Sequence, residues 1–225
     1  MNPKIIVIDD EIDFLESVRR GLITSGFKGI QTESDPQRAI DTVENSKGLE
    51  VALIDITMPG MDGVQVLEEI KKCRPQIECI MMTALDEART AVNCLKKGAY
   101  DYLVKPVSKE ELISSIQRAL ERKRLVDILN LGQKKSVPEL KKPAAFASIV
   151  TRNKQMLRIL KIAELHATSD SPVLITGETG TGKELLSHAI HTASDRCSRP
   201  FTPINMDAIT DSLFDSEFFG HTKGA

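Results

Sequence analysis

The chain has 225 residues, enough for one large domain or two modest ones. It is 41% hydrophobic and 28% charged, ordinary for a globular protein, and its net charge of -2 excludes a global basic field for nucleic acid or anionic lipid. No apolar stretch approaches the roughly 18 residues that span a membrane, and no signal peptide precedes the first strand-like run, so we expect a cytoplasmic protein.

The first half of the chain alternates short apolar runs with helical patterns. Buried strands are predicted at 4–8, near 29–32, at 51–54, at 77–82 and at 100–104. Helices are predicted at 12–25, 36–46, 62–72 and 86–97, and from 108 onward. Five strands that alternate with five helices predict an α/β fold with a parallel sheet covered on both faces.

The fifth helix is predicted to continue past the needs of the sheet, to about residue 131. Its apolar stripe includes Val126 and Leu129, which predicts a homodimer through this helix, with packing on a second unit as the alternative. The following stretch, 133–143, is rich in lysine and contains two prolines, which indicates a linker. We therefore divide the chain into three parts: 1–122, an extension and linker at 123–145, and a second unit at 146–225.

Polar groups stand at the ends of four predicted strands. Asp9 and Asp10 follow the first strand, while Asp55, Thr83 and Lys105 end the third, fourth and fifth. The carboxyl ends of parallel strands form the functional edge of such a sheet, and carboxylates crowded there call for a cation such as Mg²⁺. Any one of these carboxylates alone is more often a helix cap. Together they predict phosphoryl transfer, with Asp55 as nucleophile and Thr83 and Lys105 binding phosphoryl oxygens.

Four segments resemble the signature segments of receiver domains. They are Ile-Asp-Asp-Glu at 8–11, the run from Leu53 to Gly63, Met-Thr-Ala at 82–84 and Val-Lys-Pro at 104–106. The resemblance covers about residues 3 to 122 and implies a flavodoxin-like domain with a five-stranded parallel sheet in the order 2-1-3-4-5.

The same resemblance implies roles for individual residues. Asp10 and Asp55 would bind Mg²⁺ directly, with the carbonyl of Thr57 as a third ligand and Asp9 acting through water. A sensor histidine kinase would be the phosphoryl donor. Tyr102 matches the switch aromatic of the family, which turns inward when Thr83 moves toward the phosphoryl group, and the peptide before Pro106 is typically cis in such domains.

The second unit is predicted to contain a helix at 154–167, a short buried strand at 173–176 and a helix that ends near 193. A glycine-rich loop connects the last two, with the sequence Gly177-Glu178-Thr179-Gly180-Thr181-Gly182-Lys183. Consecutive amides in such a loop, together with the helix N-terminus, form a cradle for phosphates. Glu184 stands where the generic motif has Ser or Thr.

The run 177–184 resembles the Walker A motif of sigma-54-dependent, NtrC-type transcription activators. Asn205-Met206 and the stretch from Glu217 to Ala225 resemble the same family. The resemblance implies an N-terminal fragment of a P-loop AAA+ domain in which residues 177 to 184, Glu184 included, contact ATP. The family's Walker B strand, sensors, arginine fingers and DNA-binding domain do not follow, so we expect a truncated module that binds ATP weakly and does not turn it over.

The two resemblances together imply a two-component response regulator that is phosphorylated on Asp55. In a full-length relative its output partner would be sigma-54 RNA polymerase. The alternative, from a different functional class, is an interaction module or phosphate sink with no output of its own.

Overall fold

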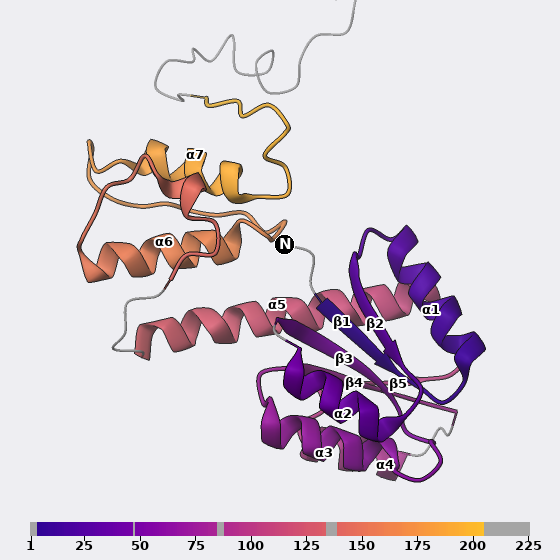
Figure 1. The fold of residues 1–225 in the computed structure, drawn as a ribbon. Helices are drawn as coiled ribbons and strands as arrows, with labels where there is room; N and C mark the ends of the chain where they lie inside the picture. Colours follow the sequence, from indigo (N-terminus) through magenta and orange to yellow (C-terminus); the bar gives the residue numbers. More distant parts are fainter. Residues whose placement is uncertain (1–3, 47, 85–87, 134–138, 205–225) are drawn as a thin grey trace, which may run out of the picture.

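The computed structural model describes residues 4–46, 48–84, 88–133 and 139–204. The first unit contains a five-stranded sheet between two layers of helices, and the described part of the second contains two helices and a short 3-10 turn (Figure 1). A long helix at the end of the first unit lies beside the second unit.

All five strands of the sheet are parallel. They are β1 (Lys4–Ile8), β2 (Gly29–Glu33), β3 (Leu49–Asp55), β4 (Glu78–Thr83) and β5 (Asp101–Val104). Their order is β2-β1-β3-β4-β5, as the resemblance implied.

The register of the sheet brings four strand ends level with one another. Ile8 pairs with Ile54, Asp55 with Met82, and Thr83 with Val104. The residues that follow these pairs, or belong to them, therefore meet at one edge of the sheet. This register is the structural basis of the candidate site.

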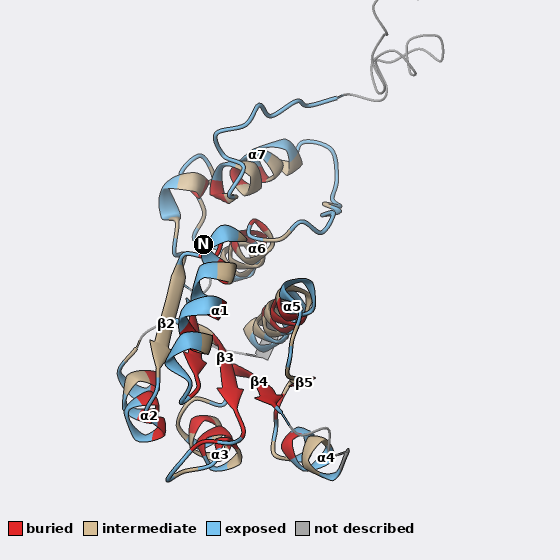
Figure 2. Ribbon diagram, turned by 90° about the vertical axis from the view of Figure 1, so that its right-hand side faces the viewer, coloured by how far each residue is buried: buried red, intermediate tan, exposed pale blue. Residues whose placement is uncertain are grey.

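The helices of the first unit cover both faces of the sheet. They are α1 (Ile12–Thr24), α2 (Pro36–Asn45), α3 (Gly63–Cys73), α4 (Ala88–Lys96) and α5 (Lys109–Gln133). Figure 2 shows α1 and α5 on one face of the sheet and α2, α3 and α4 on the other. Ile5 and Val7 of β1 pack in the core on the α1 and α5 side, whereas Ile6 and Ile8 pack in the core on the α2, α3 and α4 side. Both faces of β1 are therefore buried, which explains its unbroken apolar run.

The second unit packs around Phe146. Its elements are the 3-10 turn η1 (Pro143–Phe146), α6 (Lys154–His166) and α7 (Lys183–Ala193). Phe146 is buried against the apolar sides of both helices, and α6 also contacts α5 of the first unit. Val126 and Leu129 of the α5 stripe remain exposed, and the apolar core of the second unit includes no residue of α5, so packing of the stripe on the second unit, the alternative to a dimer, is not seen in the described residues.

The prediction of a strand at 173–176 is wrong: the described structure has no strand there. Residues 173–176 form no ladder, and Leu174 is 88% exposed. A strand needs a neighbouring strand to satisfy its amides and carbonyls. Within residues 139–204 no other segment forms one, so the apolar run has nothing to pair with there.

Candidate functional site

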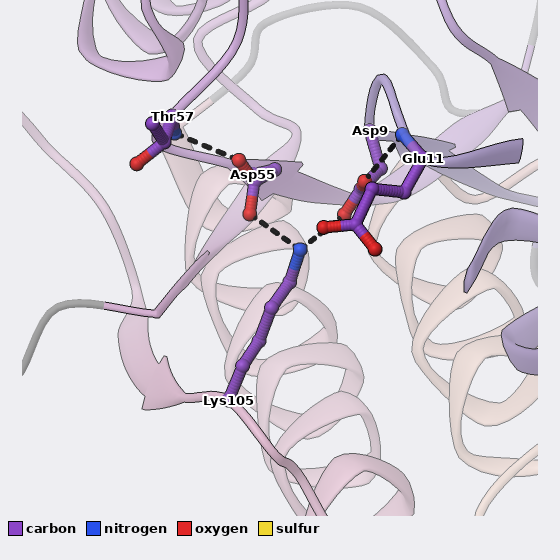
Figure 3. A network of polar contacts seen from close by, with 5 residues as sticks. All are labelled: Asp9, Glu11, Asp55, Thr57 and Lys105. Carbon is purple, nitrogen blue, oxygen red and sulfur yellow. Dashed lines mark hydrogen bonds and ion pairs between the residues drawn. The ribbon is translucent and has the colours of Figure 1, made fainter.

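Two buried carboxylates converge on one lysine at the carboxyl edge of the sheet (Figure 3). Nζ of Lys105 lies 2.6 Å from Oδ2 of Asp9 and 2.6 Å from Oδ1 of Asp55. The side chain of Asp9 is 0% exposed and that of Lys105 only 14%. A charge so poorly hydrated is stable only when it is paired, and the ammonium of Lys105 compensates both carboxylates, which repel each other.

Backbone amides hold the remaining carboxylate oxygens. The amide of Glu11 donates to Oδ1 of Asp9 at 3.0 Å, and the amide of Thr57 donates to Oδ2 of Asp55 at 2.7 Å (Figure 3). Both carboxylates are therefore fixed by the turns that follow β1 and β3. Oδ1 of Asp55 faces Lys105, and Oδ2 faces the Thr57 amide.

The balance of burial and charge shifts the pKa of both partners. Burial raises the pKa of Asp55, the nearby Asp9 adds to this effect, and the hydrogen bond and charge of Lys105 oppose it without reversing it. Burial acts to lower the pKa of Lys105, but its hydrogen bonds to Asp55 and Asp9 outweigh this and raise it. Lys105 is therefore held in its charged form, and its ammonium opposes the rise in the Asp55 pKa that burial causes.

A glycine at the start of α3 sets the loop that carries Thr57. A Cβ atom at Gly63 would lie 1.9 Å from the carbonyl oxygen of Asp55, so the helix approaches β3 more closely than any other residue allows. The Gly63 amide donates to the carbonyl of Ile56, and Asp62 and Gln65 form a capping box. Sequence analysis placed Gly63 inside a signature segment without assigning it this role.

The structure places the other predicted residues around this core. Thr83 is fully buried at the end of β4, and its carbonyl accepts from the Lys105 amide at 2.6 Å. Tyr102 is half-buried on β5, packed against the core of the α2, α3 and α4 layer, and Asp10 is exposed beside Asp9. The peptide between Lys105 and Pro106 is cis, as the resemblance implied.

Sequence analysis did not single out Phe14. Its ring, on the first turn of α1, lies with its centroid 4.2 Å from Nζ of Lys105. The helical pattern gave no sign of this contact, because it marks only which residues face the sheet. The one available sign was an aromatic residue five positions after Asp9, next to the predicted carboxylate edge.

The glycine-rich loop of the second unit curls around its own lysine. Gly180 and Gly182 have φ of +80° and +83°, a conformation that favours glycine. Nζ of Lys183 donates to the carbonyls of Gly177 at 3.0 Å and Glu178 at 2.7 Å. Thr181 also donates to the Glu178 carbonyl. These two contacts turn the Lys183 ammonium back onto the carbonyls of its own loop.

The remaining loop residues are solvent-facing. Thr179 is exposed, and Glu184 lies exposed in the first turn of α7. The segments Asn205-Met206 and 217–225 lie outside the described residues. Among the helices that the structure describes, none is both long and apolar enough to cross a bilayer.

Comparison with known families agrees with both units. Residues 5–117 match the family described as response regulator receiver domain, and residues 149–225 match the sigma-54 interaction domain. The chain belongs to the response-regulator receiver family. Its domain content is that of a two-component response regulator joined to a sigma-54 interaction domain.

Curated relatives include transcription regulators. The chain is 38% identical to the transcriptional regulatory protein ZraR of Klebsiella oxytoca over 98% of its own length and 47% of the relative. It is 38% identical to the regulatory protein AtoC of Escherichia coli K12 over 99% of its own length and 47% of the relative. The chain thus spans about half the length of the curated relatives it matches.

Solved structures resemble both the receiver and the whole chain. A receiver domain from Clostridium thermocellum, 34% identical with a TM-score of 0.52, covers 55% of this chain and is itself covered over 98% of its length. NtrX from Brucella abortus in complex with ATP, 29% identical with a TM-score of 0.56, covers 99% of this chain, which spans 48% of NtrX. The receiver fold and the partial AAA+ unit both agree with these structures.

Proposed function

We propose that Asp55 accepts a phosphoryl group from the phosphohistidine of a sensor histidine kinase. The observation that carries this proposal is the ammonium of Lys105, held 2.6 Å from both Asp55 and Asp9 at the open edge of a receiver sheet. An oxygen of Asp55 attacks the phosphorus, a P–O bond forms and the P–N bond breaks, and the imidazole nitrogen keeps the electron pair. Lys105 and Thr83 then bind the oxygens of the transferred group.

The donor atoms proposed at this edge are carboxylate and carbonyl oxygens, the type that Mg²⁺ prefers. Two converging carboxylates already share one cation, the Lys105 ammonium, and the exposed Asp10 adds a third carboxylate beside them. Within the described residues no three such side chains converge closely enough to hold a metal, so the set is not preassembled around one. We propose Asp10, Asp55 and the carbonyl of Thr57 as ligands, with Asp9 acting through water. The ion would neutralise phosphoryl oxygens during transfer.

Substitution of the acceptor tests the proposal. Asp55→Asn removes the nucleophile while keeping size and the hydrogen bond from Thr57, so labelling by a phosphodonor with Mg²⁺ should fall to background. Asp10→Asn, which keeps Asp55, should reduce labelling and raise the Mg²⁺ concentration needed for it. Undiminished labelling of the Asp55→Asn chain would sink the assignment.

The output of the switch is transcription activation with sigma-54 RNA polymerase in the whole protein. Support comes from the match to the sigma-54 interaction domain and from curated relatives that are transcription regulators. The alternative is a phosphate sink without output. A reporter at a sigma-54 promoter separates the two, since a sink would leave the reporter unchanged by Asp55→Asn.

We further propose that the glycine-rich loop binds adenine nucleotide weakly and that these 225 residues do not hydrolyse it. The amides of 177–182 and Lys183 supply phosphate contacts, whereas Glu184 replaces the hydroxyl that usually holds the metal. Hydrolysis also needs an acidic metal ligand and an arginine finger, which alone is worth about 10³ to 10⁵ in rate. Phosphate release with Mg²⁺-ATP should match that of the Lys183→Ala chain, and turnover lost in that control would contradict this.

A further inference from the structure

The ammonium of Lys105 has three partners of different kinds. Two are the carboxylates of Asp9 and Asp55, and the third is the ring of Phe14, with its centroid 4.2 Å from Nζ. An ammonium has three N–H donors, and the face of an aromatic ring attracts a cation through its quadrupole. At 14% exposure the Lys105 side chain has little access to water, so the ring takes a place that water would otherwise fill.

The chain anchors Phe14 to the same turn that fixes Asp9. Phe14 lies on the first turn of α1, directly after the Asp9 turn, and packs against the apolar core between α1, α5 and the sheet. The ring is half-buried, which leaves part of its surface for the lysine. Lys105 directly follows β5. Its contact with Phe14 therefore links α1 to the loop after β5 across the carboxyl edge of the sheet.

We propose that Phe14 is a positioning residue for phosphoryl transfer, a role that rests on the proposed function of Asp55. The transferred group brings new anionic oxygens to Asp55, and the ammonium must turn from the carboxylates toward them. A ring face attracts the ammonium without a fixed hydrogen-bond direction, so Lys105 can make this turn while its charge stays compensated. A water molecule in that place would need hydrogen-bond partners of its own and would hydrate the ammonium in competition with the phosphoryl oxygens.

The effect should appear in the affinity for a phosphoryl mimic. Replacing Phe14 by leucine keeps an apolar side chain of similar reach and removes the quadrupole. We expect the dissociation constant of beryllofluoride, measured with Mg²⁺, to rise roughly two- to thirtyfold, the range that cation–ring contacts span from exposed to desolvated sites. The rate of labelling by a small phosphodonor should fall in the same direction.

A graded series separates the cation contact from simple packing. Phenylalanine at position 14 is replaced in turn by its mono-, di- and trifluorinated forms, which keep the ring shape while withdrawing electron density from the face. Beryllofluoride affinity should decline stepwise along the series, and the ¹⁵N resonance of the Lys105 ammonium should move with it. The same series at Phe27, a buried ring in the same core, is the matched control and should leave affinity unchanged.

The outcomes distinguish this inference from the function on which it rests. An unaltered chain that is not labelled and does not bind beryllofluoride would overturn the assignment of Asp55, and with it the role of Phe14. Normal labelling of the unaltered chain together with a flat fluorinated series would overturn only the role of Phe14. Thermal unfolding of each variant shows that it is folded, and the near-isosteric fluorinated rings keep the test valid if Phe14→Leu does not fold.

Discussion

Gly63 controls the distance between α3 and the phospho-acceptor strand. Because a Cβ there would lie 1.9 Å from the Asp55 carbonyl oxygen, Gly63→Ala must push α3 or β3 away. We expect the free energy of unfolding to fall by about 1 to 3 kcal/mol, and labelling of Asp55 to slow as the Thr57 amide moves. Chemical denaturation and phosphodonor labelling measure the two effects.

Gly21→Ala is the matched control for this substitution. Gly21 lies inside α1, and no atom stands within 4 Å of a Cβ built there. Alanine in a helix interior is favoured over glycine by about 1 kcal/mol, so this variant should be slightly stabilised and fully labelled. A Gly63→Ala chain that behaves like the Gly21→Ala chain would show that the close approach of α3 does not matter.

Sequence patterns predicted some functional residues and missed others for a physical reason. Asp9, Asp55 and Lys105 follow apolar runs, and parallel strands place their carboxyl ends together, so their proximity could be inferred. Phe14 and Gly63 act through distances between elements. The helical period of α1 predicts which of its faces is buried, but not that the Lys105 ammonium contacts the Phe14 ring. The distance between α3 and β3 likewise has no local signal in the sequence.

At the scale of elements, α5 has one apolar surface that is buried and another that is exposed. One surface packs against the sheet, whereas Leu125, Val126 and Leu129 remain exposed, Leu129 at 69%. We expect Leu129→Glu to weaken a homodimer formed through this helix, because a charge would be buried in its contact. Sedimentation of the full chain at micromolar concentration, with and without beryllofluoride, measures the change.

A surface substitution elsewhere controls for added charge alone. Val150 in the second unit is 95% exposed, so Val150→Glu alters net charge equally without touching α5. It should sediment like the unaltered chain. A strict monomer for the unaltered chain under both conditions would contradict the dimer.

The elements of the second unit show a different limit of prediction. The glycine-rich loop and α7 were predictable, because glycine, lysine and helical periodicity are local signals. The run 173–176 has the composition of a buried strand, but a strand exists only through its neighbours. A ladder depends on residues distant in sequence, which a local pattern does not contain.

At the scale of the whole molecule, the two units meet through an incompletely satisfied contact between α5 and α6. Arg124 is buried there and paired with Glu121, but its Nε and Nη1 have no hydrogen-bond partner within the described chain, and neither has Nδ1 of His166. A cavity of about 750 Å³ lies beside Arg124 between the units. Buried donors without partners destabilise a contact, so the units should separate more readily than either unfolds.

The pH dependence of this contact follows from His166. Burial lowers the pKa of His166 below its ordinary 6.5, and the charge of Arg124 lowers it further, against a smaller opposing effect of Glu121. At pH values well above 6.5, His166 is neutral whether the two units touch or not. As the pH falls through 6.5, the freed imidazole takes up a proton that the buried one resists, so contact stability is lost on acidification.

We therefore expect the contact between the units to weaken as the pH falls below about 6.5. Energy transfer between dyes on exposed Ser17 of α1 and Thr192 of α7 measures the separation, with exposed Cys197 replaced by serine. His166→Gln should remove most of the pH dependence, because glutamine does not titrate, whereas His188→Gln on the exposed side of α7 should retain it. An unchanged pH profile in the His166→Gln chain would place the titrating group elsewhere.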